Sequence, residues 1–90
     1  MIKYFIEEKI TDLENMCEPA QIRLHGKKGI EGFDEEVYRD DFAAAHGWDR
    51  YQDAVRGISR LQKMDAEIVK LSGHKRFSHA YLIEYMVVNE

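Results

Sequence analysis

Four histidines are the side chains of this 90-residue chain best suited to bind a metal ion or to transfer a proton near neutral pH. A metal site on one helix needs two ligands a single turn apart, as in the known zinc motifs. The histidines do not follow such spacings; they are His25, His46, His74 and His79. Ligands could still assemble from distant segments, but the spacing predicts no metal site, and no motif indicates another cofactor.

Two other segments contain residue types that catalysis uses. Cys17 is the only cysteine, and its acidic neighbour Glu18 disfavours the reactive thiolate, so we expect a small buried apolar residue there. Residues 25–29 superficially resemble a phosphate-binding glycine loop, but the preceding strand and the GK[ST] ending are missing. The sequence therefore predicts a protein that is not an enzyme.

The basic segment after Ser72 is the strongest candidate for ligand binding. If a helix begins near residue 75, its free backbone N–H groups would attract an anion. The adjacent side chains would add charge-assisted hydrogen bonds to a nucleotide or phosphate. This predicted anion site comprises Gly73, His74, Lys75 and Arg76. A solvated turn, or pairing with the acidic segment, explains the same residues and is the more frequent arrangement.

Acidic residues are concentrated in the middle of the chain. Residues 31–53 carry eight acidic against two basic side chains, whereas the whole chain has a net charge of −4. These acids could be a solvated surface or a face that docks on a basic partner protein. The candidate partner-binding residues are Asp34, Glu35, Glu36, Asp40 and Asp41. Direct nucleic-acid binding is disfavoured, and only a basic patch gathered on one face would restore it.

Size and composition predict one domain over residues 1–90 with a thin core. Two acids interrupt the first apolar run, so no secretory signal is expected, and no stretch is long and apolar enough to span a membrane. With a single cysteine, a cytoplasmic location is the simplest expectation.

Apolar residues at spacings of three and four predict an all-α fold, a small bundle of three or four helices. The expected helices cover residues 2–17, 34–46, 49–71 and 75–88, the last two forming an antiparallel hairpin. The 49–71 helix has the clearest pattern, with a coiled-coil-like seam. The seam is formed by Ala54, Gly57, Leu61, Met64, Ile68 and Leu71. Whether residues 20–30 and 80–88 are helical or extended is left open by their composition.

The last segment is apolar on every side, and so short a chain has little with which to cover it. We therefore expect self-association, with an oligomer interface at Tyr81, Ile83, Tyr85 and Met86. The predicted function is a non-enzymatic protein–protein interaction module, with a small acidic inhibitor or regulator as one form of it. The alternative is an oligomeric protein that binds a small anion at residues 73–76.

Overall fold

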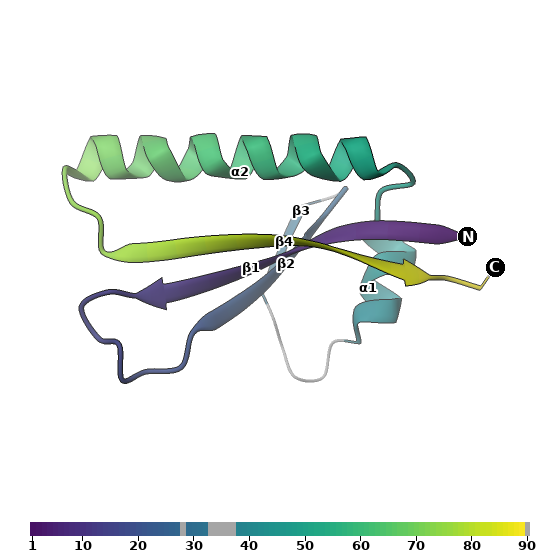
Figure 1. Ribbon diagram of the computed structural model, residues 1–90, viewed down its shortest axis with the longest axis horizontal. Helices are drawn as coiled ribbons and strands as arrows, with labels where there is room; N and C mark the ends of the chain where they lie inside the picture. The colour runs from purple at the N-terminus through teal and green to yellow at the C-terminus, as the bar shows by residue number, and fades with distance from the viewer. Residues whose placement is uncertain (28, 33–37, 90) are drawn as a thin grey trace.

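The computed structural model describes residues 1–27, 29–32 and 38–89, and these form an α+β fold of four strands and two helices (Figure 1). The elements are β1 (Ile2–Asp12), β2 (Gln21–Gly26), β3 (Gly29–Gly32), α1 (Arg39–His46), α2 (Tyr51–Ser72) and β4 (Phe77–Val87). All paired strands are antiparallel, in the order β3-β2-β1-β4. The predicted all-α bundle is therefore wrong.

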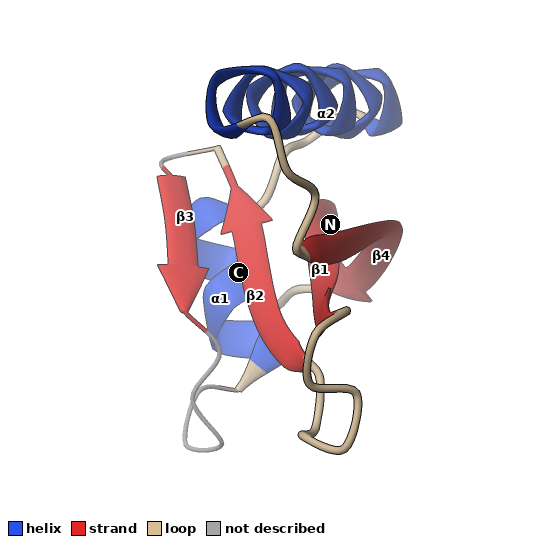
Figure 2. Cartoon of the chain, turned by 90° about the vertical axis from the view of Figure 1, so that its left-hand side faces the viewer, coloured by secondary structure: helices blue, strands red, loops and turns tan. Residues whose placement is uncertain are grey.

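β1 is the central strand and is covered on both faces. Phe5 and Ile6 are neighbours in sequence, so their side chains point to opposite sides of the sheet, yet both are fully buried. Phe5 packs with Leu24 of β2 and with Phe42 of α1. Ile6 packs with Trp48 and with α2. The two helices thus lie on opposite faces of the sheet (Figures 1 and 2).

The segment between the helices passes beside the N-terminal end of β1. Tyr4 and Trp48 form an isolated antiparallel bridge, with both N–H···O distances at 2.8 Å. The bridge continues the sheet beyond the last β1–β2 pair, Ile6 and His25. It brings the chain from the α1 face to the α2 face and places the Trp48 ring beneath the first turns of α2.

α2 matches the predicted 49–71 helix closely, and Gly73 ends it in the left-handed conformation (φ 68°). Its predicted apolar seam is buried only in part: Ala54 and Gly57 are buried, whereas Ile68 is 63% exposed and Leu71 is 84% exposed. The first half of α2 therefore makes the contact with the sheet. Neither helix in the described part of the chain combines the length and apolar composition that a membrane crossing requires.

Two of the expected helices are strands. Residues 2–17 contain β1, and residues 75–88 contain β4, so the predicted C-terminal helical hairpin is a helix followed by a strand. The open question over residues 20–30 and 80–88 is answered by β2, β3 and β4, which are extended. Of the expected 34–46 helix, the described part is α1, and residues 34–37 lie outside the described residues. β1 is covered on both faces and β4 is apolar at most positions of both faces, so neither strand shows the apolar–polar alternation that distinguishes a strand from a helix, and this explains the errors.

Gly57 offers a test of the close packing between α2 and the sheet. A Cβ atom at this position would lie 2.9 Å from Cη2 of Trp48 and 3.0 Å from Cδ1 of Ile6. We expect Gly57→Ala to lower the free energy of unfolding by about 1 kcal/mol, although alanine is the better helix former by a similar amount. Urea denaturation followed by circular dichroism measures this. Ser59→Ala, at an exposed position of α2, is the control and should change stability by no more than about 0.5 kcal/mol. A more stable Gly57→Ala variant would contradict the packing.

Candidate functional site

A carboxylate lies buried between the sheet and α2. The side chain of Glu8, in the middle of β1, belongs to a residue that is only 5% exposed. Its Oε1 lies 2.7 Å from Nε2 of His25, and its Oε2 lies 2.6 Å from Nδ1 of His79. A buried carboxylate without partners would cost several kcal/mol, so these two imidazoles are what allow Glu8 to remain ionised there.

Strand register brings the three side chains together. Ile6 pairs with His25 on β2, and Ile10 pairs with His79 on β4. Each histidine is therefore a diagonal neighbour of Glu8 on the same face of the sheet. We call this group, together with Asp65 of α2, the Glu8 network.

Asp65 connects the Glu8 network to the helix. Its Oδ1 lies 2.9 Å from Nε2 of His79, so both ring nitrogens of His79 face carboxylate oxygens. Ionised carboxylates only accept hydrogen bonds, and the ring satisfies both of them only when it carries both hydrogens as imidazolium. The network thus ties β2, β1, β4 and α2 together through one chain of charge-assisted contacts.

The network changes the titration of the groups around it. Burial alone would raise the pKa of Glu8, but the hydrogen bonds and charges of His79 and His25 outweigh burial and lower it below 4.5. Tyr81 stands directly across from Glu8 on β4. Burial, followed by the nearby charges of Glu8 and Asp65, raises the pKa of Tyr81 well above its ordinary value. Its hydroxyl therefore stays protonated at neutral pH.

Two cavities flank α2, one at each end of the network. The cavity beside His79, of about 390 Å³, lies under the second half of α2 and includes Asp65, Arg23, Ile68 and Phe77 in its lining. The other cavity, of about 260 Å³, lies beside His25. An apolar wall with a few charged groups is the usual composition of a ligand pocket, so both are candidate binding sites.

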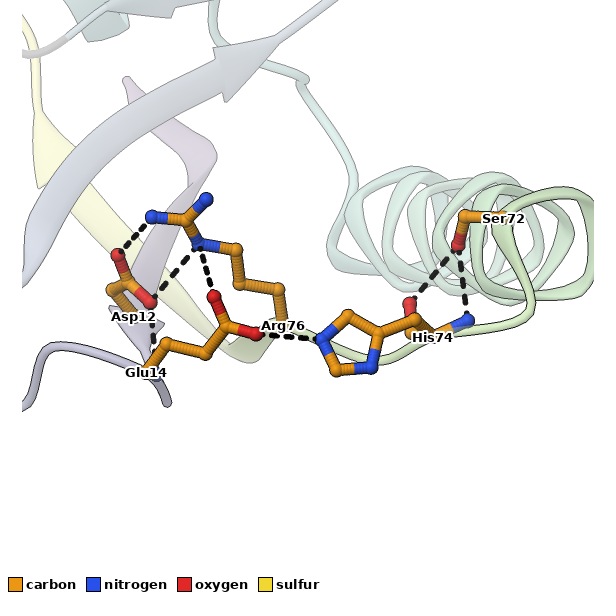
Figure 3. Close-up of polar contacts among 5 residues, drawn as sticks. All are labelled: Asp12, Glu14, Ser72, His74 and Arg76. Atoms are coloured by element: carbon orange, nitrogen blue, oxygen red, sulfur yellow. Dashed lines mark hydrogen bonds and ion pairs between the residues drawn. The ribbon is translucent and has the colours of Figure 1, made fainter.

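The predicted anion site at residues 73–76 has a different local structure from the one expected (Figure 3). Gly73 follows the C-terminal end of α2, and the next element is β4, so no helix begins here. The side chain of Arg76 donates hydrogen bonds to Asp12 at 3.1 and 3.3 Å and lies 3.4 Å from Glu14. His74 lies 2.8 Å from the same Glu14. Anion binding stays a prediction, without the helix N-terminus on which it depended.

These contacts hold the turn between α2 and β4 against the end of β1. The backbone N–H of Leu13 donates to the carbonyl of Arg76 at 2.8 Å, and the Ser72 hydroxyl donates to the carbonyl of His74 at 2.9 Å. The hydrogen bond from Arg76 lowers the pKa of Asp12, and Asp12 in turn raises that of Arg76. The side chains of His74 and Arg76 therefore stabilise the turn.

The four predicted interface residues of the last segment do not share one face. Because β4 is a strand, Tyr81, Ile83 and Tyr85 face α2 and Met86 faces α1. Tyr81 and Ile83 are half-buried against the α2-side cluster, and Met86 is half-buried against the α1-side cluster. Tyr85 is 66% exposed, which leaves it the most accessible of the four.

The predicted acidic face is described only in part. Asp40 and Asp41 are exposed in the first turn of α1, where acids favour the helix N-terminus. Asp34, Glu35 and Glu36 lie outside the described residues. Docking on a basic partner through these residues stays a prediction.

The positions of Cys17 and of two histidines differ from those expected. Cys17 is exposed, so its predicted buried role is wrong. The described residues contain no group of three or more His, Cys, Asp or Glu side chains placed to hold a metal ion. The Glu8 network was missed because it depends on cross-strand register. The one signal for it is an acid between Ile6 and Ile10, which indicates a buried carboxylate only once the segment is known to be a strand.

Comparison with known proteins identifies no relative, because no family model, no curated protein and no solved structure matches this chain.

The network predicts a specific dependence of stability on pH. We expect Glu8→Gln to lower the free energy of unfolding at pH 7 by about 3 kcal/mol, because it removes the ion that two imidazoles face. A lowered pKa means that the ionised carboxylate stabilises the fold above its unfolded pKa near 4.5, and that this contribution is lost as pH falls through the folded pKa. The difference between the two proteins should therefore narrow below about pH 4.5.

Urea denaturation at a series of pH values measures both effects. Glu67→Gln, at an exposed position of α2, is the matched control and should change stability by no more than about 0.5 kcal/mol at any pH. A pH-independent difference for Glu8→Gln would mean that ionisation of Glu8 does not stabilise the fold.

Proposed function

We propose that this protein is a non-enzymatic protein–protein interaction module that self-associates, and that β4 pairs with β4 of a second copy. The observation that carries the proposal is the free edge of β4. This strand is eleven residues long and pairs with β1 on one side, while no strand of the described residues pairs with its other side. A long edge strand presents unpaired backbone donors and acceptors to another strand.

The side chains along this edge support the same proposal. Proteins usually protect an exposed edge with lysine, proline or a bulge, and β4 contains neither lysine, arginine nor proline. Instead, its exposed apolar residues are Phe77, Leu82, Tyr85 and Val87. Its one carboxylate, Glu84, lies 3.3 Å from Arg39. Burial and the neighbouring Glu7 raise the pKa of Glu84, so this group opposes pairing less than a free acid would.

One register of two antiparallel β4 strands uses the whole strand. If the two-fold axis passes through Leu82, all eleven residues have partners and Leu82 lies opposite its own copy. Phe77 then lies opposite Val87, and Tyr81 lies opposite Ile83. Glu84 lies opposite Ala80 rather than opposite another acid, so no like charges meet. The result is one continuous sheet across both copies, an isologous interface of the kind most homodimers use.

Two expectations from the sequence are kept beside this proposal: a cytoplasmic location, and docking of a basic partner protein on the acidic face that includes Asp40 and Asp41. Neither depends on the pairing of β4. The proposal for self-association can therefore be tested by itself.

The register makes a test by disulfide cross-linking possible. In a Cys17→Ser background, Leu82→Cys should form a covalent dimer under mild oxidation, because directly opposed residues have Cα atoms about 4.5–5.5 Å apart. Ala80→Cys is the control: it is two residues from the axis, so the two copies would lie about 13 Å apart, which is too far for a disulfide. Equal cross-linking of both variants would contradict this register.

Light scattering over a dilution series tests self-association without cross-linking. We expect a dimer mass for the unmodified chain at about 100 μM, because an interface this apolar should hold at that concentration. Leu82→Lys should shift the protein to the monomer mass while circular dichroism stays unchanged. A monomer mass for the unmodified chain at that concentration would exclude the proposed function.

A further inference from the structure

The cavity beside His25 lies away from β4 and from the turn at residues 73–76, and none of its lining residues belongs to either segment. It lies between the middle of α2 and the end of β2, has a volume of about 260 Å³ and is open to solvent. The lining residues that matter for its chemistry are His25, Lys27, Trp48, Gly57, Arg60 and Leu61. Gly57 allows the wall to approach the Trp48 ring closely, because a side chain there would meet that ring.

Two cations line this cavity, and neither forms an ion pair in the described part of the chain, although the charge of Lys27 acts on Asp49. Lys27 follows β2, and its backbone N–H donates to the carbonyl of His46, which fixes the start of its side chain. Arg60 comes from the exposed side of α2. Free guanidinium and ammonium groups that converge on one cavity are typical of sites for phosphate or carboxylate groups.

The positive surface continues into a neighbouring hollow. Arg56, Arg60 and Lys63 recur at spacings of four and three, so they share one face of α2. All three line a shallow hollow of about 520 Å³ that also includes Trp48. Asp53 is the carboxylate in the lining of this hollow, and its Oδ1 lies 3.5 Å from Arg56. A basic patch is thus gathered on one face of a chain whose net charge is −4.

His25 lines the cavity but offers no donor to it. The residue is 3% exposed, its Nε2 contacts Glu8, and its Nδ1 is buried without a hydrogen-bond partner in the described part of the chain. A ligand in the cavity would therefore be bound through Lys27 and Arg60.

We propose that this cavity binds a small phosphorylated compound, with Lys27 and Arg60 as donors to one phosphate group. Arg56 and Lys63 extend the positive charge for a second phosphate, and Trp48 forms the apolar wall. The cavity has room for one such group, and this favours a small compound over a long nucleic acid.

Isothermal titration calorimetry of the full chain with sodium pyrophosphate and with ATP tests the proposal. We expect saturable binding of at least one of the two at concentrations below about 1 mM, a range typical of modest small-ligand sites. Lys27→Gln/Arg60→Gln should weaken binding by about tenfold or more, because each variant residue removes a charge-assisted hydrogen bond. Lys9→Gln/Lys70→Gln removes the same charge at exposed positions away from the cavity and should leave affinity within about twofold.

Absence of binding by both compounds, or equal weakening of binding by the two double variants, would each overturn the proposal. Binding of a single-stranded oligonucleotide with no binding of pyrophosphate or ATP would overturn it as well. None of these outcomes depends on whether β4 pairs.

Discussion

An ionised carboxylate under a helix is the constraint on which the α2 side of this fold depends. Glu8 is buried, so the strands on either side of β1 must each supply an imidazole, and α2 must place Asp65 over His79. A slip of one residue in either strand pair would turn a histidine to the other face and leave the charge without a partner. The Glu8 network therefore selects the register as well as joining the layers.

The same polar layer shapes how α2 packs. The helix contacts the sheet closely through Ala54 and Gly57, where Ile6 and Trp48 provide an apolar surface. Farther along, the sheet presents Glu8 and His79 instead, and the apolar residues of the helix become exposed, as Ile68 and Leu71 are. The cavity beside His79 lies under this second half of α2. Ionised side chains, which an apolar core would exclude, thus lie directly beside the apolar cluster.

The proposed pairing through β4 and the proposed ligand site beside His25 use separate parts of the molecule. β4 is the edge of the sheet, whereas the cavity beside His25 lies over β2, on the other side of the central strand. The Glu8 network connects the two regions, because His79 of β4 and His25 of β2 share one carboxylate.

Sequence by itself determined the local features that follow from short-range periodicity: the helix over 49–71 and its end at Ser72 and Gly73. It could not distinguish a helix from a strand over residues 2–12, because the apolar pair Phe5 and Ile6 suits a strand covered on both faces as well as it suits a helix. Tertiary structure alone decided the functional groupings. Glu8, His25 and His79 are far apart in sequence and meet through strand register, and α2 adds Asp65 to them. Arg60 and Lys27 likewise line one cavity although they are far apart in sequence. Contacts between distant residues depend on how strands pair and how helices pack on them. The spacing of residues within one element does not predict these contacts.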